Sequence, residues 1–208
     1  MKKRIAIITV VIILAITAIF MTACNKKGKQ DVYATLDALV AKEYANVTVN
    51  VTTAKQGHTL KDKYVISASD GQSTITYKIE ELNTFDLASG SVPENYKTVK
   101  TGVAKVKDGK VTEINGDEAS VEFEKIGANV FVFKQEYFSN AVETTDGNGN
   151  DIFRADITDT AAFMQSKEVR NEAKIVVKYN KTTAELMSIE LSYSTRSATS
   201  VQISYIFN

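Results

Sequence analysis

The amino-acid sequence predicts an α+β protein built on one large curved antiparallel sheet, a half-barrel, with an N-terminal amphipathic helix and a short second helix covering the concave face. The first observation is an early segment with apolar residues at helical spacing, and the second is the alternation of apolar and polar residues in most later segments. The third is that a helix followed by three alternating segments occurs near the start and again at the end. These segments give roughly ten strands, and a sheet of that width must curl because strand twist accumulates across it.

The first 24 residues have the organisation of a bacterial lipoprotein leader. Lys2, Lys3 and Arg4 precede an apolar run over residues 5–20, and the run is followed by Met-Thr-Ala before Cys24. A charged start, an apolar centre and a small-residue end are typical of a secretory signal. The run is shorter than the roughly 20 residues that a spanning helix needs. We therefore expect cleavage of this segment in preference to a permanent transmembrane helix.

Residues 21–24 resemble the bacterial lipobox, with Met21 where leucine is more common. The resemblance implies cleavage before Cys24 and a diacylglyceryl thioether on its sulfur, which makes Cys24 the predicted lipidation site. Cys24 is the only cysteine of the chain, and an exported protein with a single thiol has no other evident use for it. The alternative is a chance cysteine near a signal cleavage site. We expect a lipid-anchored protein on the extracytoplasmic face of the cell membrane.

The expected organisation is a signal peptide over 1–23, the lipidated cysteine and a short tether over 24–30, and one domain over 31–208. The mature chain would have 185 residues, with 22 basic against 25 acidic side chains, a formal charge of −3. This length allows one domain with a substantial core. A slightly acidic chain predicts no electrostatic binding to nucleic acid.

The N-terminal helix is expected over residues 31–44, with Asp31 as its N-cap. Its apolar side chains fall on one face, so the helix should lie with that face on the sheet. The residues of this face are Val32, Leu36, Leu39 and Val40.

Alternating apolar residues predict the strands. Asp-Gly pairs at 70–71 and 108–109 are typical of tight hairpin turns, because both positions accept positive φ. Asp159 is expected to cap the short second helix, 160–165, and residues 82–96 are expected to form a long connection. Strands are expected at 47–52, 64–68, 75–79, 99–106, 110–114, 121–123, 130–133 (after a kink at Gly127), 152–157, 175–179, 187–193 and 201–207.

These features together resemble the LolA/LppX-like half-barrel lipoproteins of bacterial envelopes. The resemblance lies in the leader with Cys24, the early amphipathic helix, the aromatic residues between 131 and 138, Phe163 in the short helix, and the closing strand 201–207. Known members carry or receive lipids and lipoproteins inside the concave apolar face. The resemblance therefore implies a lipid or similar apolar ligand in the concavity, without assigning a ligand contact to any residue.

Catalysis finds little support in the sequence. The single histidine, His58, lies in a polar connection, and no nucleophile-and-base signature accompanies it. No His/Cys cluster for zinc and no phosphate-binding glycine motif occurs. The carboxylate pairs at 80–81 and 117–118 are expected at solvated strand ends or turns, and a paired-carboxylate hydrolase is the enzymatic alternative. We expect no enzyme activity, no cofactor and no metal site.

The loop 146–151 has Asp, Asn and Asn at alternate positions, as at the start of a calcium loop. An EF-hand requires Gly at its sixth position and Glu at its twelfth, and the chain has Asp151 and Ile157 there. A turn rich in residues that accept positive φ explains the same string, and incidental calcium binding is the alternative.

Two function hypotheses follow. In the first, the protein is a membrane-anchored carrier or receptor that binds an apolar ligand, such as an acyl chain, between its first helix and the concave sheet. In the alternative, the helix simply fills the sheet, and the protein is a non-enzymatic structural or protein-interaction module of the envelope. An internal void of several hundred Å3 would favour the first, and a tightly packed helix the second. The expected cavity lining is Leu36, Val40, Ile66, Ile79, Ile189, Leu191 and Ile203.

Overall fold

The computed structural model describes residues 31–83, 96–108, 110–117, 123, 126, 130–165 and 170–208. The predicted signal peptide, Cys24 and Gly127 lie outside the described residues, as does most of the expected connection 82–96. The helices are α2 (Val32–Val40) and α3 (Thr160–Phe163), with a short 3-10 helix, η4 (Gln135–Tyr137). The strands are β1 (Asn46–Lys55), β2 (His58–Ser69), β3 (Gln72–Asn83), β4 (Lys97–Lys107), β5 (Lys110–Gly116), β6 (Phe138–Thr145), β7 (Asp151–Ile157), β8 (Arg170–Asn180), β9 (Glu185–Thr195) and β10 (Ser200–Phe207).

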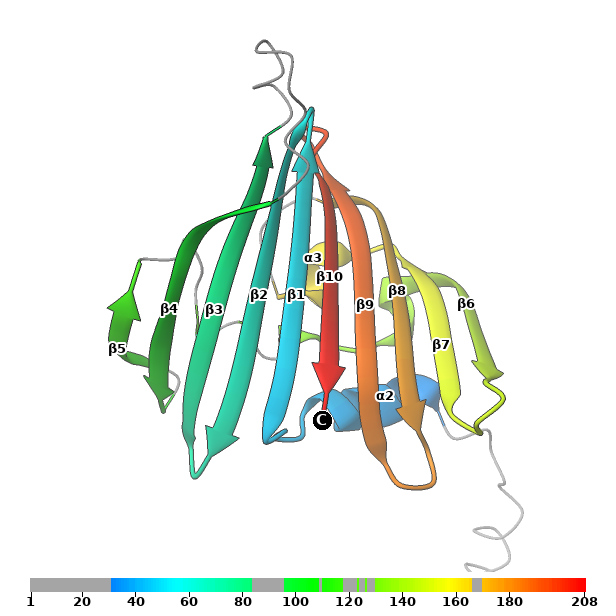
Figure 1. The fold of residues 1–208 in the computed structure, drawn as a ribbon. Helices are drawn as coiled ribbons and strands as arrows, with labels where there is room; N and C mark the ends of the chain where they lie inside the picture. The colour runs from blue at the N-terminus through cyan, green and yellow to red at the C-terminus, as the bar shows by residue number, and fades with distance from the viewer. Residues whose placement is uncertain are drawn as a thin grey trace, which may run out of the picture.

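The ten strands form one antiparallel sheet in the order β5-β4-β3-β2-β1-β10-β9-β8-β7-β6. The chain starts at the middle of the sheet, builds one half outward to β5, and then builds the other half inward from β6 to β10 (Figure 1). The first and last strands pair in the centre, with Val47 opposite Phe207. The sheet is curved and unclosed, with both helices on the same face (Figure 1). The predicted half-barrel is confirmed.

The predicted hairpin turns are confirmed by their backbone geometry. Asp70 and Gly71 have φ of 52° and 73°, and β2 and β3 pair in register on both sides of them. Asp108 also has a positive φ, 51°, between β4 and β5. A two-residue turn with both central φ angles positive matches the twist of the flanking strands, so the sequence sets these registers locally.

Both predicted helix caps are present. The Asp31 carboxylate accepts a hydrogen bond from the Tyr33 backbone N–H at 3.0 Å, and the Asp159 carboxylate accepts one from Ala162 N–H at 2.9 Å. The helices are shorter than expected, since α2 ends at Val40 and α3 at Phe163. A nine-residue helix is marginal by itself in water, so burial of the apolar face of α2 against the sheet must stabilise it.

One expected strand is not a strand in the structure, and one observed strand was not expected. Residues 130–133 are not a strand, because Val132 N–H donates to the Phe163 carbonyl and Phe133 N–H to the Asp37 carboxylate, both at 3.0 Å. These residues cross the concave side between the helices. Conversely, β6 was not expected from the sequence. It is an edge strand with only Phe138 buried, so it lacks the alternation that reveals a half-buried strand.

The register expected for residues 187–193 is wrong at its first position. Leu186 is buried at 3 % exposure, whereas Met187 is 37 % exposed. The cause is a β-bulge, because Tyr179 pairs with Leu186 and Lys178 with Ser188, which leaves Met187 as the extra residue. Beyond the bulge, Ile189 and Leu191 face the core as expected.

Candidate functional site

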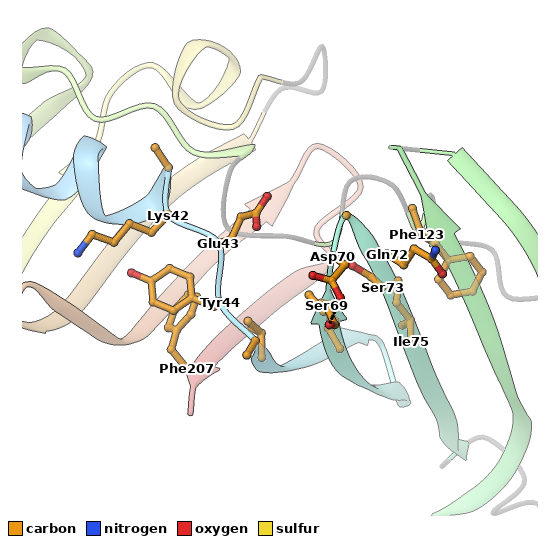
Figure 2. Close-up of a pocket in the computed structure, with 17 residues that line it drawn as sticks. Lys42, Glu43, Tyr44, Ser69, Asp70, Gln72, Ser73, Ile75, Phe123 and Phe207 are labelled. Atoms are coloured by element: carbon orange, nitrogen blue, oxygen red, sulfur yellow. Dashed lines mark hydrogen bonds between the residues drawn. The ribbon is translucent and has the colours of Figure 1, made fainter.

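The concave side has a cleft of about 590 Å3 beside the helix α2 (Figure 2). One wall is the connector 41–45, which joins α2 to β1, and the other is the β2–β3 turn with the adjoining ends of both strands. Val106 of β4, Phe123 and Phe207 of β10 complete the lining. The volume lies within the range of about 300–1,000 Å3 that is usual for small-molecule sites.

The connector is held in place by three contacts made by Tyr44 and Ala45, the two residues before β1. The Tyr44 ring lies 4.6 Å from the ring of Phe207, between centroids, and its hydroxyl donates to the Leu39 carbonyl at 2.9 Å. The Ala45 carbonyl accepts a hydrogen bond from Ala68 N–H at 2.8 Å. The connector therefore forms a fixed wall over the ends of β1 and β2.

The floor of the cleft is apolar because it is the core-facing side of the strands. In β2 and β3, the alternation that buries Tyr64 and Tyr77 continues to the hairpin end, where smaller residues leave space. Ala68 and Ser73 form a cross-strand pair at this end, and both line the cleft. The apolar side chains of the floor are Val47, Ile66, Ala68, Ile75, Val106, Phe123 and Phe207.

The rim of the cleft is polar, and both walls carry a carboxylate. Glu43 lies on the connector, and Ser69, Asp70 and Gln72 lie at the hairpin turn. In Figure 2, the carboxylates of Glu43 and Asp70 lie between the two walls. Lys42 also belongs to the lining, but its ammonium donates to the Ala184 carbonyl at 2.6 Å and is directed away from the hairpin (Figure 2).

An aromatic cluster explains why the cleft lies in this half of the concavity. The other half is filled by rings from α2, the crossing segment, α3 and the strands behind them. Phe163 of α3 lies at ring-centroid distances of 5.1 Å from Phe131 and 5.3 Å from Phe133, and Tyr33 of α2 lies 5.7 Å from Phe138. Such rings fill space closely, so the open volume is left beside α2 and not beneath it.

The predicted lining residues separate into two groups. Ile66 lines the cleft. The residues expected beneath the helix, Leu36, Val40, Ile189 and Leu191, are at most 2 % exposed and belong to the packed core. Ile79 is buried and Ile203 partly buried, and neither lines the cleft. The cleft is therefore displaced toward β2 and β3 from the place that the sequence predicts.

The connector residues of the cleft were missed by the sequence interpretation. Lys42, Glu43 and Tyr44 fall within the helix expected over 31–44, whereas the structure places them in the connector after Val40. The stretch contains no Gly or Pro, so no local signal marks the helix end at Val40. Ala68 is the last residue of the strand expected over 64–68, and its small size at the end of a strand is the one signal that favours an open volume there.

The structure shows the surroundings of the residues considered for catalysis and metal binding. His58 is the first residue of β2, and its Nε2 lies 2.6 Å from a carboxylate oxygen of Glu81 on the neighbouring strand. The predicted turn at 146–151 is present, with the Asp146 carboxylate accepting from Asn148 N–H at 2.8 Å and Asn150 N–H at 2.9 Å. The ion pair with Lys178 and these amides hold the pKa of Asp146 well below its usual range. Within the described part of the chain, no group of three or more His, Cys, Asp or Glu is placed to hold a metal ion.

Asp62 is the one acidic side chain of β2 on the concave face. Its Oδ2 accepts from the Tyr64 hydroxyl at 3.2 Å, while its buried Oδ1 has no hydrogen-bond partner among the described residues. Burial raises the pKa of Asp62, and the hydrogen bond from Tyr64 acts in the opposite direction. Asp62 lies outside the cleft lining.

Comparison with known proteins gives no family for this chain. No family model and no curated protein matches it. A solved structure of a hypothetical protein from Chlamydia trachomatis matches over 85 % of this chain and 92 % of that chain, with 8 % sequence identity and a TM-score of 0.25. A superposition of this quality carries no argument about function. None of the helices in the described ranges is long and apolar enough to cross a membrane.

Proposed function

We propose that this protein is a membrane-anchored extracytoplasmic lipoprotein that binds an apolar or lipid ligand in the cleft between the connector 41–45 and the β2–β3 hairpin. The observation that carries the proposal is the cleft of about 590 Å3, with an apolar floor on the concave face of the sheet. An alkyl chain on this floor would be held by apolar burial at about 25 cal/mol per Å2, which requires no polar motif. The half-barrel likeness to lipid-carrying envelope lipoproteins stays a prediction that agrees with this proposal.

The position of the cleft fits an anchored protein. In Figure 1, α2, which follows the predicted tether, lies at the same end of the sheet as the β2–β3 turn. A six-residue tether over 25–30 spans at most about 20 Å. An anchor at Cys24 would therefore hold this end of the domain, with the cleft, close to the bilayer.

Ala68 offers a direct test of the cleft. The probe is N-phenylnaphthylamine, an uncharged apolar dye whose fluorescence rises on burial. Ala68→Phe places a ring in the cleft and removes room for the dye; a loss of about 55 Å2 of apolar contact corresponds to about 1.4 kcal/mol, or a tenfold higher Kd. The matched control is Val65→Phe, because Val65 lies on the same strand with its side chain on the opposite, exposed face.

The expected result is weaker dye binding in Ala68→Phe and unchanged binding in Val65→Phe, with far-UV circular dichroism showing both variants folded. Native mass spectrometry of the purified mature domain, with lipid extraction of whatever copurifies, provides a second readout. A parent protein that binds no dye and copurifies with no lipid would overturn the proposal.

The tight packing of α2 favours a second candidate, a structural or protein-interaction module of the envelope without a small ligand. Leu36 is fully buried and Leu39 is 3 % exposed, so this helix already fills the concavity beneath it. Failure of both binding readouts would leave this second candidate as the function.

A further inference from the structure

The charges around the cleft restrict the head group that its ligand carries. Glu43 and Asp70 face each other across the opening, one from each wall (Figure 2). Asp108 lies directly behind the turn, since a Cβ at Gly71 would be 3.9 Å from its Oδ1. The opening of the cleft between Glu43 and Asp70, here called the mouth, is therefore bordered by carboxylates on both walls.

Among the described residues that line the cleft, no side chain brings positive charge to this opening. Lys42 is the single basic residue in the described part of the lining. Its ammonium is bound to the Ala184 carbonyl at the β8–β9 turn and is directed away from the hairpin (Figure 2). A ligand carboxylate at the mouth would thus meet like charges and lack a cation, whereas an ammonium group would meet two carboxylates.

We propose that the cleft selects a cationic amphiphile: a molecule with a single alkyl chain on the floor and a protonated amine head between Glu43 and Asp70. This inference rests on the proposed function, because it assigns a ligand class to the same cleft. The Ser69 hydroxyl lies beside Asp70, since it donates to the Asp70 carboxylate at 3.2 Å, and its oxygen can still accept, so the N–H groups of the head have an uncharged acceptor as well as charge. A free fatty acid is disfavoured by the same arrangement.

The test compares two probes that differ only in the head group, dodecylammonium and dodecanoate, each displacing N-phenylnaphthylamine from the parent at pH 7. An alkyl amine is protonated at that pH, as lysine is. We expect dodecylammonium to displace the dye at about tenfold lower concentration than dodecanoate in dilute buffer, since each exposed charge pair changes affinity by a few-fold. The preference should shrink in about 0.5 M salt, which screens exposed charges.

Charge-neutral variants test whether the preference for dodecylammonium over dodecanoate comes from the carboxylates at the mouth. Glu43→Gln with Asp70→Asn should bring the two probes to nearly equal affinity. The matched control is Glu136→Gln with Glu190→Gln, which removes the same charge from exposed residues outside the cleft lining and should keep the preference. An adventitious attraction to the slightly acidic domain as a whole would be reduced equally by both double variants, and that result would overturn the inference.

The outcomes distinguish a wrong ligand class from a cleft that binds no ligand. If the dye binds and dodecanoate displaces it as well as dodecylammonium does, the head-group inference is wrong while the cleft remains the ligand site. If neither the dye nor any amphiphile binds the parent, the proposed function fails and the inference fails with it. Glu43→Gln alone, which leaves the β2–β3 turn unchanged, should reduce the preference for dodecylammonium, and it keeps the test decisive if the Asp70 substitution disturbs the turn.

Discussion

At the scale of single residues, the space around a buried tyrosine depends on a glycine of the next strand. Tyr77 of β3 is 1 % exposed, and its hydroxyl donates to the Asp117 carbonyl beyond the end of β5. Gly102 of β4 is the cross-strand partner of Tyr77. A Cβ at Gly102 would overlap the Tyr77 hydroxyl and would lie 2.6 Å from the Asn115 carbonyl oxygen. The absence of a side chain at position 102 is what lets the tyrosine reach its acceptor.

Gly102→Ala should therefore destabilise the domain. The added methyl group displaces either a buried ring or the backbone of β5, and overpacking of this kind costs about 1–3 kcal/mol. Urea denaturation followed by circular dichroism measures the loss. Gly147→Ala is the control, because a Cβ there meets no atom within 4 Å; equal midpoints for the two variants would contradict this account of Gly102.

At the scale of elements, the bulge in β9 decides which side chains of that strand reach the core. Met187 is the extra residue between two paired positions, so the alternation changes phase at this point. Leu186 then faces inward next to Tyr179, and Met187 lies on the solvent side. The sequence pattern alone favours the opposite assignment, because Met187, Ile189 and Leu191 are evenly spaced.

The pair of substitutions Leu186→Asp and Met187→Asp tests the bulge. Leu186→Asp buries an unpaired carboxylate, which costs several kcal/mol and is comparable with the stability of a whole domain. Met187→Asp places the same group in solvent and should change the midpoint of urea unfolding only slightly. A larger effect at position 187 than at 186 would restore the regular register.

At the scale of the whole molecule, the predicted anchor and the observed domain make separate contributions. The domain supplies a fold and a cleft from residues within 31–208, and retention at the membrane is predicted to depend on Cys24. A thioether-linked diacylglyceryl group contributes roughly 0.8 kcal/mol for each buried CH2. Exposed large apolar residues on the described surface lie on separate strands, for example Val99, Val142 and Ile206.

Cys24→Ser should release the protein from membranes without changing its fold. The measurement is fractionation of cells into membrane and soluble material, with circular dichroism of the variant as the control for folding. A serine variant that still sediments with membranes would show that residues 1–23 act as an uncleaved anchor, and the lipoprotein interpretation would be wrong.

The sequence by itself determined what depends on local physics. Alternation defined the half-buried strands, the Asp-Gly pairs defined two hairpins, and Asp31 and Asp159 defined the helix starts, because each of these is set by neighbours within a few residues. The half-barrel followed from the number of strands and their accumulated twist. The edge strand β6 and the bulge at Met187 were not predicted from the sequence, since neither produces an apolar pattern of its own.

Only the tertiary structure decided where open volume remains. Apolar residues that line a cleft and apolar residues that fill a core have the same alternation, so Ile66 and Ile189 are equivalent in the sequence. Ile189 is fully buried in the core that contains the aromatic rings around Phe163, while α2 ends at Val40 and the connector after it lines a cleft together with Ile66. That difference arises from side chains far apart in the chain, and packing among such residues has no local signature.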